Sequence, residues 1–188
     1  MTLSYNDYQQ ITRETSGSDE LAVLALGLVG ESIEVKRAWD RLKRFDARSP
    51  LVKSATELTA ELGDVLWYAA RIYDVCGADF RAWQDKRMLS DRWFQMLTPG
   101  DAAVDDLLVL SAEVSEHVKK VVGHGHELDA NRMLNATADV VRVISCLACA
   151  IHGPSGLGTV FDYNVEKLRK RYPNGFEVER SVNRSLGD

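Results

Sequence analysis

The chain has 188 residues, a net charge of −5 at pH 7 and a hydrophobic content of 45%. This composition supports one compact core or two small fused units, and the interleaved, mildly acidic charge argues against a protein that binds nucleic acid. The first ten residues lack a signal-peptide pattern, the longest apolar stretches are too short to cross a membrane, and three cysteines are too few for a disulfide scaffold. We therefore expect a cytoplasmic protein with no membrane partner.

Helical periodicity dominates the chain from its N-terminal part onward. Apolar residues recur at helical spacing at Leu24, Leu28 and Val35, and a second stripe runs from Leu58 to Ile72. The pattern predicts helices at about 4–15, 19–44, 52–76, 79–95, 101–121, 130–152 and 158–171. No convincing strand pattern with a period of two occurs, so the predicted fold class is all-α.

The residues at the predicted helix ends support these boundaries. Ser4 and Asp7 have the spacing of a capping box, and Ser18 is placed to cap the second helix. Gly77 follows the third helix, where a left-handed residue is common. The segment 98–101, Thr-Pro-Gly-Asp, is the clearest break in the chain.

The two halves of the chain repeat one pattern of segments. The aligned pairs are 26–37 with 108–119, 61–72 with 136–147, and 85–93 with 164–172. The first pair carries Glu-x-x-Glu in both copies, and the order of the three segments is the same in both halves. Since the offset between the copies changes by only a few residues, we predict a duplicated helical unit.

Four carboxylates in the first half form two pairs with the same spacing. Glu31 lies on the apolar stripe with Glu34 one turn further, and Glu61 and Asp64 repeat this spacing on the next helix. Two such helices packed antiparallel would bring four carboxylates together, where two unit charges 4 Å apart repel by roughly 4 kcal/mol at an effective dielectric of about 20. Magnesium relieves such repulsion and combines carboxylate ligands with substrate phosphates. The pattern therefore favours a magnesium site with room for phosphates over a solvated acidic surface.

Two other kinds of metal or redox site are disfavoured. A di-iron bundle needs Glu-x-x-His on each of two helices, whereas His117 follows Glu113 by four residues. Cys146-x-x-Cys149 lies in an apolar run with no second cysteine pair, so we predict buried helical thiols rather than a zinc or redox site.

These motifs resemble the MazG-like, all-α nucleoside triphosphate pyrophosphohydrolase superfamily. Its signature is Glu-x-x-Glu, a spacer and Glu-x-x-Asp, which here is Glu31 to Glu34 and Glu61 to Asp64. The resemblance extends to the segments 5–9 and 124–129 and, most specifically, to Asn-Val-Glu-Lys-Leu-Arg-Lys-Arg-Tyr-Pro-Asn-Gly-Phe at 164–176. It covers nearly the whole chain in two passes.

The resemblance implies an activity, a cofactor and a set of site residues. The family cleaves nucleoside triphosphates between the α and β phosphates, releasing a monophosphate and pyrophosphate, and so cleans the nucleotide pool. Magnesium, which manganese can replace, holds the phosphates and activates water. The implied metal ligands are Glu31, Glu34, Glu61 and Asp64, one of the glutamates also acting as general base, and the implied substrate contacts are Tyr68, Asn164, Lys167 and Arg171. Family members associate, so a homodimer of chains is expected.

Each half departs from the family pattern in a different way. In the second half Ala136 replaces the counterpart of Glu61, whereas in the first half Met88 replaces the counterpart of Lys167. We therefore expect two fused MazG-like repeats forming a pseudo-dimer, at 1–97 and 101–178, followed by a tail at 179–188. Such a pair would make one complete site, with metal ligands from the first repeat and phosphate contacts from the second.

Other functions remain open at this point. A non-catalytic nucleotide-binding or regulatory protein would keep the same fold, and a purely structural helical adaptor would show no dependence on divalent metal. Within the enzyme class, the compatible substrates are non-standard nucleotides, dUTP or dCTP, and deoxynucleoside triphosphates in general. Trp39 and Trp67 are the tryptophans that we would first expect to stack on a base.

Overall fold

The computed structural model describes residues 3–44, 51–85 and 100–179, and the regular elements in these segments are all helical. They are α1 (Tyr5–Glu14), α2 (Leu21–Lys43), α3 (Leu51–Val75), the 3-10 helix η1 (Phe80–Gln84), α5 (Asp101–His124), α6 (Ala130–His152) and α7 (Gly156–Arg171). The predicted all-α fold class is confirmed.

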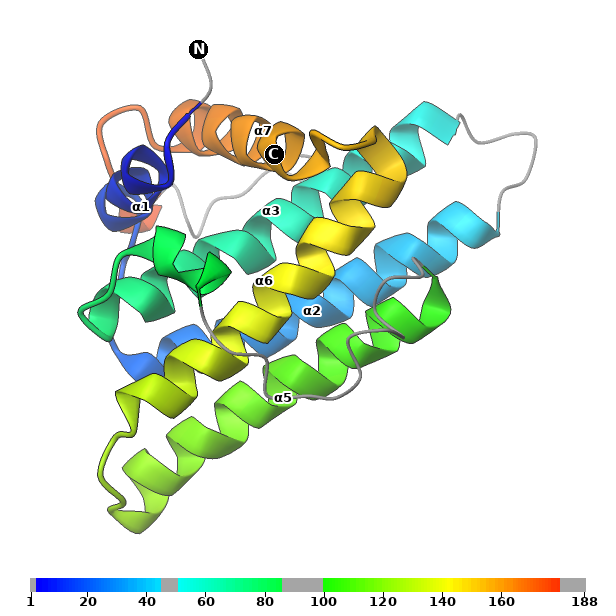
Figure 1. The fold of residues 1–188 in the computed structure, drawn as a ribbon. Coiled ribbons are helices and arrows are strands. Elements are labelled where there is room, and N and C mark those ends of the chain that lie inside the picture. The colour runs from blue at the N-terminus through cyan, green and yellow to red at the C-terminus, as the bar shows by residue number, and fades with distance from the viewer. Residues whose placement is uncertain (1–2, 45–50, 86–99, 180–188) are drawn as a thin grey trace.

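Two antiparallel helix hairpins form the centre of the molecule (Figure 1). α2 packs against α3, α5 packs against α6, and the hairpins meet through α2 with α5 and α3 with α6. α2 and α5 are antiparallel, because Trp39 Nε1 donates to Asp101 Oδ1 at one end and Ser115 Oγ donates to the carbonyl of Ala25 further along. α7 lies across α3 and α6, and α1 contacts α3, η1 and α7.

One hydrophobic core is shared by both halves of the chain. Leu24, Leu28 and Val35 of α2 are buried, as the predicted stripe requires, and so is the stripe from Leu58 to Ile72 on α3. Residues of α5, α6 and α7 join the same cluster. Since a fully buried Leu or Val side chain contributes about 1.5–3 kcal/mol, the shared core stabilises the two hairpins as one unit.

The predicted helix ends are partly correct. The capping box of Ser4 and Asp7 forms, with the Asp7 amide donating to Ser4 Oγ at 3.1 Å. Gly77 has a φ of +71°, and the amide of Ala78 donates to the carbonyl of Tyr73, which closes α3 in a left-handed turn. The prediction for Ser18 is wrong: the N-cap of α2 is Glu20, because Ser18 Oγ accepts from the Glu20 amide and completes a turn before the helix.

Three further expectations are revised. The helix predicted at 79–95 begins as the short η1, and its part beyond residue 85 lies outside the described residues. Cys146 is partly buried but Cys149 is exposed, since it lies on the outer side of the last turn of α6, so a buried thiol at Cys149 was wrong. Among the described helices, α6 is long and apolar enough to cross a membrane, contrary to the sequence expectation, but 67% of its apolar window is buried inside the protein, as in a core helix.

Candidate functional site

Three of the four predicted carboxylates lie together between α2 and α3. Glu31, Glu61 and Asp64 each offer an oxygen, and these oxygens lie within 4.8 Å of one another. The i, i+3 spacing on α3 puts Glu61 and Asp64 on one face, and the position of Glu31 on the inner side of α2 turns it toward them. Glu34 is not part of this close group: its side chain is 39% exposed and its Oε1 accepts from Arg37 Nη1 at 2.5 Å.

The cluster carries an excess of negative charge. Burial raises the pKa of Glu61, and the charges of Asp64 and Glu34 raise it further, against the opposing effects of Lys167 and Arg41. A raised pKa means that ionising Glu61 costs more free energy here than it would in water. A divalent cation on the three oxygens would remove that cost, and an all-oxygen donor set suits magnesium or manganese.

α7 brings side chains from the second half of the chain to these carboxylates. Lys167 Nζ lies 2.5 Å from each carboxylate oxygen of Asp64. Asn164 Nδ2 donates to Asp64 Oδ1 at 3.1 Å, and the Asn164 side chain is fully buried. The juxtaposition of first-half carboxylates with second-half polar residues is therefore a feature of the fold.

A buried tyrosine of α1 forms a hydrogen bond with Asn164. The hydroxyl of Tyr8 donates to Asn164 Oδ1 at 2.9 Å, and it lies 3.4 Å from the carbonyl oxygen of Gly63. A Cβ at Gly63 would come within 2.8 Å of Asn164 Cβ, so the glycine permits the close approach of α7 to α3. Tyr8 lies in the segment 5–9 of the family resemblance but was assigned no role from the sequence, because the spacing within one short helix does not show which distant residue a tyrosine contacts.

A cavity of about 330 Å³ opens beside the cluster, within the usual size of a small-molecule site. Its wall combines two of the carboxylates with an arginine, four aromatic rings and the loop that precedes α2. The residues that line it are Thr15, Ser16, Gly17, Ser18, Val23, Leu24, Glu31, Asp64, Trp67, Tyr68, Leu168, Arg171, Tyr172 and Phe176. The wall of this one cavity therefore contains both charged and aromatic groups.

The aromatic part of the wall is held in place by close packing. The rings of Trp67 and Tyr68 meet edge to face, with centroids 4.9 Å apart, and Trp67 Nε1 donates to Thr15 Oγ1. The Tyr68 ring lies against Gly27, where an added Cβ would be 2.1 Å from Tyr68 Cε1. Trp39 does not line the cavity; its indole nitrogen donates to Asp101.

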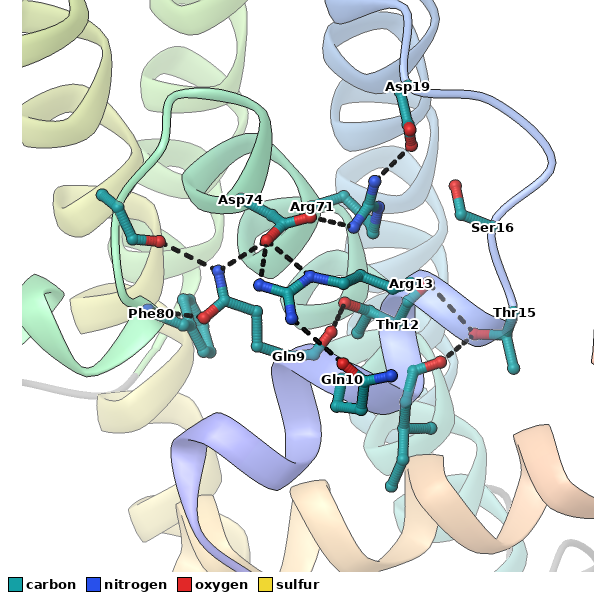
Figure 2. Close-up of polar contacts among 12 residues, drawn as sticks. Gln9, Gln10, Thr12, Arg13, Thr15, Ser16, Asp19, Arg71, Asp74 and Phe80 are labelled. Atoms are coloured by element: carbon teal, nitrogen blue, oxygen red, sulfur yellow. Dashed lines mark hydrogen bonds and ion pairs between the residues drawn. The ribbon is translucent and has the colours of Figure 1, made fainter.

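Ion pairs join α1 and the loop that follows it to α3 (Figure 2). Asp19 accepts from Arg71, whose side chain is only 2% exposed, and Arg71 Nη1 also donates to Asp74 Oδ2 at 2.5 Å. Arg13 of α1 donates to the same Asp74. On the cavity side, the ring of Phe176 lies against Gly17, so the loop is held from both sides.

The residues of the second half that the sequence aligns with this site have different chemistry. Asp139 is buried and accepts from Arg142 Nη1 at 2.8 Å, and Arg142 Nη2 donates to the carbonyl of Trp83. Glu116 pairs with Lys119 at 2.5 Å. Among the described residues, no group of three close metal-ligating side chains occurs in this half.

The eight residues that the sequence singled out are thus distributed around one region. Glu31, Asp64, Tyr68 and Arg171 line the cavity, and Glu61 completes the carboxylate group. Asn164 and Lys167 contact Asp64, whereas Glu34 pairs with Arg37 outside the close group. No protein-family model, curated protein or solved structure matches this chain.

Proposed function

We propose that this protein is a magnesium-dependent nucleoside triphosphate pyrophosphohydrolase, the activity that the MazG-like resemblance implies. One observation carries the proposal: a three-carboxylate cluster borders a cavity that also contains aromatic rings and an arginine. A nucleoside triphosphate needs these three kinds of contact, for its metal, its base and its phosphates.

Glu31, Glu61 and Asp64 would hold the metal ion, and manganese would serve in place of magnesium. Bound there, the ion neutralises phosphate charge and makes water more acidic. Glu34 is one turn along α2, and its Oε1 accepts from Arg37, an exposed partner that is easily exchanged, so Glu34 can join the ligand set by a change of side-chain conformation.

The remaining residues of the site bind and orient the substrate. Arg171 faces the cavity and supplies a planar guanidinium for the phosphates. Trp67, Tyr68 and Phe176 offer ring faces and edges to the base. Lys167 forms an ion pair with Asp64, at the border between the proposed metal site and the phosphate chain.

The reaction adds water across the α–β anhydride. The new bond joins the water oxygen to phosphorus, the anhydride P–O bond breaks, and the monophosphate and pyrophosphate leave. The water proton passes to one of the glutamates of the site, which acts as general base.

The pseudo-dimer of two fused repeats is part of the same proposal. The hairpin of α2 and α3 and the hairpin of α5 and α6 have the same order and meet through antiparallel α2 and α5, as two copies related by a two-fold axis would. We further propose that two chains form a homodimer. Leu26 and Ile33, two turns apart on α2, are 71% and 40% exposed and give the exposed side of this helix an apolar character.

The decisive experiment identifies the products. The protein is incubated with each ribo- and deoxynucleoside triphosphate and Mg²⁺, and monophosphate plus pyrophosphate are separated from diphosphate plus phosphate. We expect the first pair, and none in excess chelator. Diphosphate plus phosphate, or turnover that persists in chelator, would refute the proposal, whereas metal-dependent binding without products would identify a nucleotide sensor.

A further inference from the structure

We propose that Tyr8 is a positioning residue for Asp64, acting through the side-chain amide of Asn164. The inference rests on the proposed function, in which Asp64 holds the metal. It assigns Tyr8 a role, and it makes Asn164 a support of the carboxylate rather than a contact of the substrate.

The geometry is a chain of two hydrogen bonds across three helices. Tyr8 of α1 donates to Asn164 Oδ1 at 2.9 Å, and Asn164 Nδ2 of α7 donates to Asp64 Oδ1 of α3 at 3.1 Å. Tyr8 and Asn164 are both fully buried, whereas Asp64 is partly exposed and lines the cavity. Asn164 is not among the cavity-lining residues, so its amide contacts Asp64 from the buried side, away from the cavity.

The two bonds together fix which way the amide faces. A phenol hydroxyl that is protonated can donate to the amide oxygen, which leaves the amide nitrogen to face the carboxylate. Burial and the charge of Asp64 raise the pKa of Tyr8 well above its ordinary value, so the hydroxyl keeps its proton. Without this donor, a rotated amide would bring its oxygen against the carboxylate and repel it.

The packing holds Tyr8 independently of its hydroxyl. Its ring meets Phe161 with centroids 4.5 Å apart and Phe80 with centroids 6.1 Å apart. Tyr8→Phe therefore removes the donor and leaves the ring in place. Removing this donor alters the amide, and through it the direction of the Asp64 oxygen toward a metal ion.

The chain provides a matched control in Tyr5, three residues earlier on α1. Its ring also meets Phe80 and Phe161, and its hydroxyl accepts from Gln84 Nε2 at 3.3 Å, away from Asn164 and Asp64. Tyr5→Phe deletes the same atom from the same helix. Both variants are compared with the wild-type chain by titration calorimetry with Mn²⁺ in the absence of nucleotide, alongside thermal unfolding without metal.

We expect Tyr8→Phe to weaken Mn²⁺ binding by about 10–100-fold, the usual effect of losing a group that orients a metal ligand, while Tyr5→Phe stays within about twofold of wild type. If Tyr8 acts through Asn164, Tyr8→Phe has no further effect on Mn²⁺ binding in an Asn164→Ala background. Equal losses in both backgrounds would mean that the hydroxyl acts by another route.

The outcomes separate the two proposals. A wild-type chain that binds no Mn²⁺ overturns the proposed function. A wild-type chain that binds Mn²⁺ with a Tyr8→Phe variant that binds it equally overturns only the relay. If Tyr8→Phe is unfolded at the assay temperature, Asn164→Ala with Tyr8 intact gives the same test, and unchanged Mn²⁺ affinity there refutes the relay.

Discussion

Gly27 and Gly30 of α2 offer a sharp test of how the cavity wall is built. A Cβ at Gly27 would lie 2.1 Å from Cε1 and 2.2 Å from Cζ of Tyr68, whereas a Cβ at Gly30 has no neighbour within 4 Å. The two glycines share one helix and differ in what they face. Replacing each by alanine therefore separates the helix propensity of alanine from the contact with the ring.

The magnitudes follow from the two environments. Gly30→Ala should stabilise the protein by about 1 kcal/mol, because alanine is the better helix former. Gly27→Ala gains the same amount but displaces the Tyr68 ring, and such overpacking costs about 1–3 kcal/mol. The variants should therefore differ by about 1–3 kcal/mol, which for a chain of this size corresponds to about 2–12 °C in melting temperature.

Thermal unfolding followed by circular dichroism measures the difference, and nucleotide turnover measures its effect on the site. We expect Gly30→Ala to melt above wild type with unchanged KM, and Gly27→Ala to melt below Gly30→Ala with a raised KM, since the displaced ring enters the cavity. Equal stabilisation by both substitutions with unchanged KM would refute the packing of Tyr68 against Gly27.

Four further outcomes are expected. Glu61→Gln should nearly abolish nucleotide turnover, because magnesium tolerates a changed ligand set poorly. Glu113→Gln should leave much of the turnover. An equal loss of turnover in both variants, with the protein folded, would contradict a single site. Lys167→Ala should raise KM more than it lowers kcat, as steady-state kinetics would show. Burial alone would raise the pKa of Asp74, but hydrogen bonds from two arginines lower it. Ionised Asp74 therefore stabilises the fold, and this contribution is lost as the pH falls through the lowered pKa. The melting temperature of wild type should then drop more steeply than that of Asp74→Asn below about pH 4. Light scattering should give twice the chain mass of 21.0 kDa, and a monomer at micromolar concentration would contradict the homodimer.

The apolar stripes and the carboxylate pairs were predictable because both depend on spacing within one helix. The run from Leu58 to Ile72 is buried along its whole stripe, as a period of 3.6 residues requires. The same spacing put Glu61 and Asp64 on one face. Spacing within α2 did not reveal that Glu34 pairs with Arg37, since the choice of an exposed partner depends on side-chain conformation.

Features that depend on contacts between distant segments were less accessible. The ion pair of Asp19 with Arg71 and the hydrogen bond of Tyr8 with Asn164 join residues 52 and 156 positions apart. No pattern within a single helix predicts which distant residue will be the partner in such a contact. Ser18 illustrates a local limit: a serine before a helix also satisfies turn amides, and here it binds the Glu20 amide without capping α2.

The contact between Lys167 and Asp64 has a consequence for the order of folding. The two residues are 103 positions apart, so closing this contact orders a long loop, and we expect it to form late in folding. Until α7 docks, the hairpin of α2 and α3 holds Glu31, Glu61 and Asp64 together without the ammonium group. We expect the three carboxylates to repel one another during that interval, when a divalent cation would take the place of the missing lysine charge. Under the proposed function, the three carboxylates that would hold the metal in the folded protein are thus also the place where we expect the metal to assist folding.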